Sequence, residues 1–164
     1  MIIVICNDDP SLMGIANVSA SQDPDVFGAV YQAYGVPIPQ LAKGENLFIL
    51  SHGALLGDED GPVIGGKEDD FYTTPSMLFA NIQNLFPPGW SGNVFIDACE
   101  SATKNKALLS FAQVFLYPMA DKNPNVHVSG IVGLSSGLIP LPDDPKWKTF
   151  PEYLAEFFAG PGHS

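Results

Sequence analysis

Cys99 and His52 have the chemistry of a thiol nucleophile and its base, and each follows a short apolar run. The runs at residues 94–96 and 46–50 are rich in β-branched and aromatic side chains, which predicts two buried strands. If these strands lie parallel and adjacent, both side chains emerge at the carboxyl edge of the sheet, where open α/β sheets bind ligands. The stretch between them has room for a loop, a crossover helix and a return strand. The pairing therefore predicts a cysteine activated by a histidine.

Each of the two residues also has a purely structural explanation. A lone buried cysteine usually packs as a small hydrophobic residue, and a lone histidine is usually a satisfied part of the core. Two similar strand ends that deliver a matched pair are harder to explain in this way. The sequence therefore favours the chemical interpretation.

The alternation of apolar segments predicts one α/β domain over residues 1–164, with a mostly parallel sheet and helices on both faces. Strands are expected at residues 2–6, 46–50, 94–96 and 126–134. Helices are expected at residues 25–34, 75–85, 106–117 and 152–158. Thr74 is expected to cap the second of these helices, with Pro75 at its first position. Cys6 is expected to lie in the core.

Long loops are expected at residues 7–23 and 57–70, where the second contains six acidic residues and a small hairpin around Val63 and Ile64. Clustered carboxylates are hard oxygen ligands, so this loop could bind calcium. It lacks a regular ligand spacing, and a solvated charged loop is the simpler explanation. No metal and no cofactor is therefore expected, with calcium as the one alternative.

The composition restricts the possible partners. The chain has 164 residues, seven lysines, no arginine and 18 acidic residues, which give a net charge of −11. This balance argues against nucleic acid and anionic membranes as partners and is compatible with a cationic substrate. Two cysteines without a spacing motif argue against a disulfide scaffold or a zinc site. With no run long enough to span a membrane and no signal peptide, a soluble cytoplasmic protein of open oligomeric state is expected.

Two segments carry a family resemblance. The stretches ILSHG at residues 49–53 and FIDACES at residues 95–101 resemble the two signature strand ends of the caspase-like cysteine peptidases. This group includes caspases, metacaspases, legumain, clostripain and gingipain, and the second stretch looks most like the clostripain, metacaspase and legumain sites. The resemblance implies a caspase-like three-layer sandwich and a cysteine endopeptidase that acts on a peptide or protein substrate. Some relatives use calcium.

The resemblance also implies roles for single residues. Cys99 would be the nucleophile, and His52 would assist its attack and protonate the leaving amine. The backbone N–H groups of Gly53 and Cys99 would form the oxyanion hole. A thiolate at Cys99 would be favoured by a helix that begins just after it. No third catalytic residue is identified, and the family generally needs none.

The resemblance implies that Asp97 lines the pocket for the substrate residue that precedes the cut, because the residue two positions before the nucleophile often does so in this family. A carboxylate there favours a lysine or arginine, although legumain also has an acid at this place and accepts asparagine. Asp97 could instead cap the following turn. Asn7, Asp8, Ser135 and Ser136 follow other predicted strands and could complete the pocket walls, or could be turn residues.

Two other functions stay open. The chain is short for a peptidase of this type, so it could be a catalytically silent adaptor or scaffold domain, as in the related CHAT domains. A flavodoxin-like ligand-binding domain is a weaker alternative, because the turn after the first strand has no glycine-rich phosphate cradle.

Overall fold

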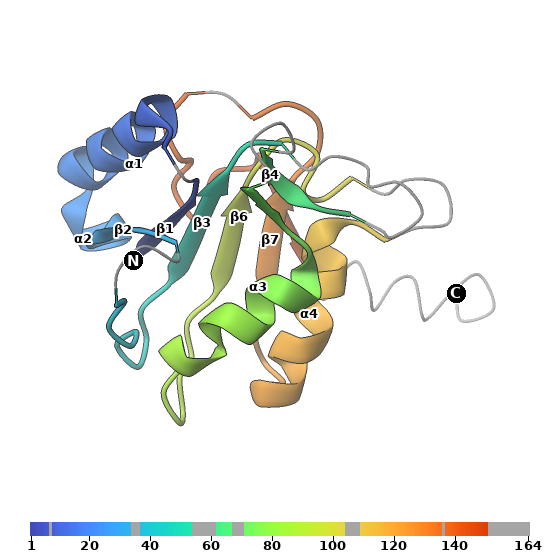
Figure 1. The fold of residues 1–164 in the computed structure, drawn as a ribbon. Helices are drawn as coiled ribbons and strands as arrows, with labels where there is room; N and C mark the ends of the chain where they lie inside the picture. Colours follow the sequence, from blue (N-terminus) through green and yellow to red (C-terminus); the bar gives the residue numbers. More distant parts are fainter. Residues whose placement is uncertain are drawn as a thin grey trace.

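The computed structural model describes residues 1–6, 8–33, 37–53, 62–66, 71–103, 109–135 and 137–150. This part of the chain is an α/β fold with a six-stranded, mostly parallel sheet, a two-stranded sheet and four α-helices (Figure 1). The large sheet consists of β1 (Ile2–Ile5), β2 (Val30–Gln32), β3 (Leu47–Ser51), β6 (Val94–Asp97), β7 (Val128–Ile131) and β8 (Trp147–Phe150). The small sheet pairs β4 (Ile64–Gly66) with β5 (Phe71–Thr73). The α-helices are α1 (Pro10–Gln22), α2 (Pro24–Phe27), α3 (Pro75–Ile82) and α4 (Phe111–Lys122). Helix α3 continues into the short 3₁₀ helix η2 (Gln83–Leu85).

The strand order of the large sheet is β2-β1-β3-β6-β7-β8. Every neighbouring pair is parallel except β7 and β8, which are antiparallel. The chain moves outward from β1 to β2 and then returns to place β3 on the other side of β1. In open α/β sheets, ligands commonly bind at the carboxyl ends of the two strands between which the order reverses, here β1 and β3.

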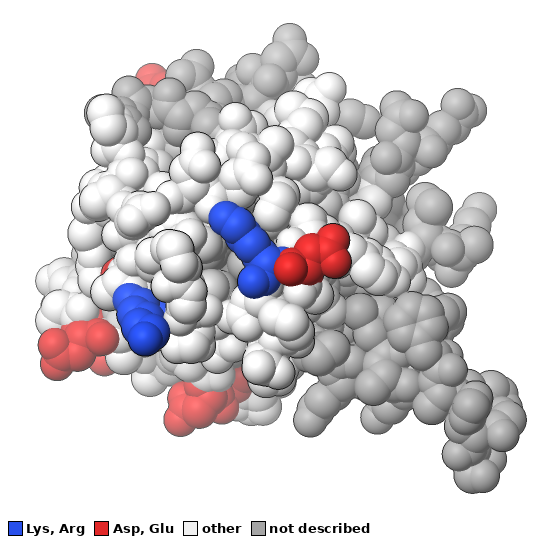
Figure 2. Space-filling view, turned by 90° about the horizontal axis from the view of Figure 1, so that it is seen from below, with Lys and Arg blue, Asp and Glu red and all other residues white. Residues whose placement is uncertain are grey.

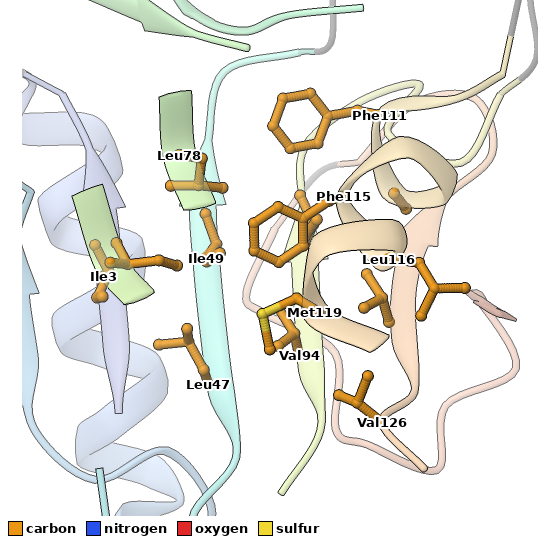
Figure 3. Packing of buried hydrophobic residues seen from close by; sticks show 14 of the residues in the cluster. Ile3, Leu47, Ile49, Leu78, Val94, Phe111, Phe115, Leu116, Met119 and Val126 are labelled. Carbon is orange, nitrogen blue, oxygen red and sulfur yellow. The ribbon is translucent and has the colours of Figure 1, made fainter. Parts of the chain in front are cut away.

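Alternating side chains of the central strands build two cores, one on each face of the sheet. Ile3, Ile49 and Val94 point toward α3 and α4, where they pack with Leu78 and Phe115 (Figure 3). Residues one step along the same strands face the other way and pack against α1 and α2. That second core includes Ile2, Val4, Phe48, Leu12 and Phe27. The sheet is therefore buried on both sides, as expected for parallel strands.

A row of aromatic rings crosses the face covered by α1 and α2. Phe27 meets the ring of Phe48 edge-on at 4.7 Å, and Phe48 stacks on Phe95 at 4.9 Å. Phe95 then contacts Trp147 at 5.1 Å. The row ties α2 to β8 through the centre of the sheet.

The structure corrects the prediction for the first third of the chain. The expected loop at residues 7–23 contains α1. Of the expected helix at residues 25–34, the described residues 25–33 instead form most of α2, β2 and the turns around them. The buried side of α1 consists of Leu12, Ala16 and Ser19, which are mostly too small to produce a strong apolar stripe. Gly28 has a φ of 68° and ends α2 after one turn.

The strands of the centre of the sheet and the elements after residue 40 agree better with the sequence predictions. Strands β1, β3 and β6 and the Thr74 cap with Pro75 at the start of α3 are confirmed, as is the burial of Cys6. Helix α4 begins after a Ser110 capping box and continues through Pro118, so it lies later than the predicted helix. β7 is shorter than predicted, and β8 was not predicted at all.

Some predictions lie outside the described residues. They include the helix at residues 152–158 and most of the acidic loop at residues 57–70. The part of that loop which is described enters the small hairpin through Ile64. No helix in the described part of the chain has the length and apolar character needed to cross a membrane.

Candidate functional site

The carboxyl ends of β3 and β6 bring the two predicted chemical residues to neighbouring positions. The strands are parallel, and Leu50 is the register partner of Asp97. His52 and Cys99 each follow two residues later, so the prediction that they end adjacent parallel strands is confirmed. The backbone segments that follow β3 and β6 approach closely here. A Cβ atom built on Gly53 would lie 3.0 Å from the Cβ atom of Cys99.

Cys99 lies in a tight turn and not at the start of a helix. The Ser101 N–H donates to the Ala98 carbonyl at 3.1 Å, which closes the turn, and Glu100 has a φ of 64°. A positive φ at this third position is typical of type II turns and is uncommon for a residue other than glycine. The next described helix, α4, begins only at Phe111. The expectation that a helix directly after Cys99 favours the thiolate is therefore wrong.

The sulfur of Cys99 is held by the backbone of Ser135, which follows β7. The Ser135 N–H donates to Cys99 Sγ at 3.1 Å, and the thiol donates to the Ser135 carbonyl at 3.4 Å. A thiolate could keep the first bond and would lose the second, because it has no proton to donate. The half-buried Cys99 thus already has one N–H donor directed at its sulfur.

Asp97 lies below this contact and is covered. The residue is 2% exposed, and its carboxylate accepts a hydrogen bond from the Ser135 hydroxyl. Burial raises the pKa of Asp97, while the Ser135 hydrogen bond and the charge of Lys146 act in the opposite direction. Ser135 therefore covers the carboxylate in this structure, and the expectation that Asp97 lines a substrate pocket stays a prediction.

His52 is bound to a residue that the sequence did not single out. Its Nε2 atom makes a hydrogen bond with the Asp9 side chain, while the imidazole itself stays half exposed. The other carboxylate oxygen of Asp9 accepts the Leu12 N–H at 3.0 Å and caps α1. This cap, followed by the bond to His52, outweighs burial and lowers the pKa of Asp9. An aspartate before a proline, directly after the first strand, was the available signal.

His52 and Cys99 therefore lie side by side along the sheet edge but have partners on opposite sides. His52 makes its hydrogen bond with Asp9, which follows β1, and Cys99 makes its hydrogen bonds with Ser135, which follows β7. In the described part of the chain no hydrogen bond joins the imidazole to the sulfur. This arrangement brings together a thiol and an imidazole without pairing them.

Gly53 and Cys99 each carry a backbone N–H at the adjacent ends of β3 and β6. Within the described ranges, neither the Gly53 N–H nor the Cys99 N–H donates to a backbone carbonyl. Two such groups on adjacent strand ends could bind an oxyanion. Of the expected wall residues, Asp8 is exposed after β1 and Ser135 contacts Cys99, while Asn7 and Ser136 are outside the described residues.

The described residues contain no group of three or more histidine, cysteine or acidic side chains that could hold a metal ion. Most of the acidic loop at residues 57–70 falls outside that search, so the calcium alternative is not tested by it.

A separate hollow of about 750 Å³ lies at the opposite edge of the sheet, near the amino ends of β6 and β7. Phe86, Trp90, Met119 and Lys122 contribute to its lining. Figure 2 shows the molecule from below, with the coloured charges on that side in separate groups among white residues. The hollow is remote from Cys99 and adds nothing to the site at the carboxyl edge.

No protein-family model, curated protein or solved structure matches the chain. The likeness to caspase-like peptidases consequently stays a resemblance of two short segments.

Proposed function

We propose that the chain is a cysteine endopeptidase with a caspase-like three-layer architecture, in which Cys99 is the nucleophile and His52 the general acid and base. The observation that carries this proposal is the meeting of the β3 and β6 ends, with Gly53 directly against Cys99. A glycine at this contact lets the backbone approach a reacting carbonyl without a Cβ atom in the way. The geometry is suited to an acyl group held between the two strand ends.

The reaction would proceed in two steps. In the first, His52 accepts the thiol proton, Cys99 Sγ forms a bond with the carbonyl carbon, and the oxyanion binds to the N–H groups of Gly53 and Cys99. The C–N bond then breaks as the imidazolium gives its proton to the leaving amine. In the second step, water adds to the thioester with His52 as base, and the carboxylic acid product and the thiol are released.

For this reaction the imidazole and the sulfur must come together. The thiol would give up its bond to the Ser135 carbonyl when its proton moves to His52, while the Ser135 N–H would continue to stabilise the thiolate. Catalytic hydrogen bonds are often long or absent before substrate binds, so the unpaired arrangement is compatible with activity.

We further propose cleavage after lysine or arginine. A cationic side chain would reach Asp97 if Ser135 turned its hydroxyl away, and it would replace the positive charge that Lys146 now supplies from nearby. An unpaired buried carboxylate is unfavourable, so pairing with substrate would contribute to binding. The net charge of −11 also favours a cationic substrate.

A catalytically silent adaptor is the second candidate. The observation that favours it is the pair of opposed hydrogen bonds, which hold His52 toward Asp9 and Cys99 toward Ser135. A permanently separated pair would leave Cys99 with the reactivity of an ordinary cysteine.

Thiol reactivity and peptide cleavage separate the two candidates. We would measure iodoacetamide labelling of Cys99 and the hydrolysis of fluorogenic peptides with lysine, arginine, asparagine or aspartate before the cut, with and without calcium. The peptidase proposal expects Cys99→Ala to abolish cleavage and His52→Ala to slow it by roughly 100-fold or more. Cys6→Ala is the matched control, because it removes the other, buried thiol.

The outcomes are distinct. Cleavage that survives Cys99→Ala would rule out cysteine catalysis. An unreactive Cys99 that His52→Ala leaves unchanged, with no peptide hydrolysed, would favour the adaptor. Equal rates on acidic and basic substrates would be compatible with a cysteine peptidase but would contradict the proposed role of Asp97 in selecting lysine or arginine.

A further inference from the structure

Asp9 is placed to act on His52 from the far side of the proposed catalytic pair. It follows β1, on the other side of β3 from Cys99. One of its carboxylate oxygens contacts His52 Nε2, and the other is occupied by the N–H of Leu12. The carboxylate therefore holds the imidazole and the first turn of α1 at the same time.

We infer that Asp9 is the positioning residue of His52, which fixes the ring so that Nε2 carries the proton and Nδ1 is left as the free base. This inference rests on the proposed function, because it assigns the orientation of the same base. A carboxylate, an imidazole and a thiol thus follow the ends of β1, β3 and β6, which are consecutive strands of the sheet.

The tautomer follows from the chemistry of the partner. An ionised carboxylate has no proton, so it can only accept a hydrogen bond. Because the cap and the His52 bond lower the pKa of Asp9, the carboxylate is ionised at neutral pH. The neutral imidazole has one N–H and one lone pair, so placing the proton on Nε2 leaves the lone pair on Nδ1.

The position of Asp9 is well fixed by its own element. Its carbonyl accepts the Met13 N–H at 3.0 Å, and Pro10 occupies the first position of α1. A preset φ at Pro10 and two hydrogen bonds into the first turn leave the side chain little freedom. Orientation by a held carboxylate is the usual way in which a base is fixed for proton transfer.

The test uses Asp9→Asn, because asparagine is as good an N-cap as aspartate and so preserves α1. With its amide oxygen on Leu12, asparagine presents an NH₂ group to His52 Nε2 and favours the tautomer protonated on Nδ1. We would record the ¹⁵N shifts of His52 and the rate of Cys99 alkylation. We expect the Nδ1–H tautomer and a rate lowered by roughly 100-fold. Asp25→Asn is the matched control, because it makes the same change at an exposed position in the first turn of α2.

A double-mutant cycle distinguishes positioning from a structural effect. If Asp9 acts through His52, Asp9→Asn should add no further loss in a His52→Ala background. Asp9→Ser, which keeps a capping oxygen but removes the carboxylate, should show the same loss as Asp9→Asn, and thermal melts would check that each variant folds.

An Nε2–H tautomer retained in Asp9→Asn, or an equal loss of rate with and without His52, would overturn the inference. Wild-type alkylation that does not depend on His52 would instead contradict the proposed function, and the His52 tautomer would still decide the role of Asp9.

Discussion

At the scale of the single residue, the contact between Gly53 and Cys99 restricts which side chain position 53 can carry. A Cβ atom on residue 53 would lie at 3.0 Å from the Cys99 Cβ, closer than such atoms normally approach. We therefore expect Gly53→Ala to push the end of β3 away from β6 by a few tenths of an ångström. The alkylation rate of Cys99 should fall by roughly tenfold or more, since small misplacements of reacting groups are costly.

The global stability of Gly53→Ala should change little, because residue 53 lies beyond the last strand residue. Gly44→Ala provides the control, since nothing lies within 4 Å of a Cβ atom at that turn position. Equal thiol reactivity in both variants would show that the close contact has no chemical importance.

At the scale of the elements, Ser101 joins β6 to β7 beyond the end of their pairing. Its hydroxyl donates to the Ile96 carbonyl at 3.0 Å and accepts the Ile131 N–H at 2.8 Å. Ser101 is fully buried, and Gly130 leaves space for its hydroxyl, because a Cβ atom there would lie 2.9 Å from it. The turn that carries Cys99 is thereby tied to the next strand.

Removal of this hydroxyl should be costly. We expect Ser101→Ala to lower the free energy of unfolding by about 1–3 kcal/mol, because the Ile131 N–H loses its partner in the core. Urea unfolding would measure the change, and Ser76→Ala on the exposed side of α3 is a control that should stay within about 0.5 kcal/mol. A loss at Ser101 no larger than that of the control would contradict the proposed tie.

The central elements could be predicted from sequence, and the peripheral ones could not. β1, β3 and β6 are continuous runs of large apolar residues, so their burial is evident from the sequence, and so are the strand ends that carry His52 and Cys99. α1 buries a stripe of small residues that gives almost no periodic signal. β8 is an edge strand of four residues with only its two end residues buried.

The same contrast holds within the site. His52 and Cys99 were predicted because each follows its own strand directly. Asp9 was missed because its contact with His52 depends on β1 and β3 being neighbours, which is a property of strand order and not of local pattern. The closure of Asp97 by Ser135 is likewise a contact between segments that are distant in sequence.

At the scale of the whole molecule, buried and capped carboxylates affect stability in opposite directions as pH changes. The pKa of Asp97 is raised in the folded state, so its contribution to stability is present at low pH and is lost as pH rises through the folded pKa. The pKa values of Asp9 and Glu45 are lowered, so their contributions are present near neutral pH and are lost as pH falls.

Asp97→Asn isolates the first effect, because asparagine can accept the Ser135 hydrogen bond but cannot ionise. We expect the stability of Asp97→Asn relative to wild type to increase as pH rises from about 4 toward 7. Chemical denaturation of both proteins across this range measures the difference. A difference in unfolding free energy that is constant with pH would show that Asp97 has the same pKa folded and unfolded.

One tryptophan lies near the carboxyl ends of the parallel strands and the other near their amino ends, so the two can serve as separate optical reporters. Trp147 ends the aromatic row next to Lys146, on the side of the carboxyl edge, and its indole N–H donates to the Leu141 carbonyl at 3.0 Å. Trp90 lines the hollow at the other edge and donates to the Glu45 carbonyl at 2.8 Å. In a Trp90→Phe variant, tryptophan emission comes only from Trp147, so titration with a peptide aldehyde under selective tryptophan excitation would reveal occupancy of the carboxyl edge without any label. The complementary Trp147→Phe variant would report separately on molecules that enter the hollow.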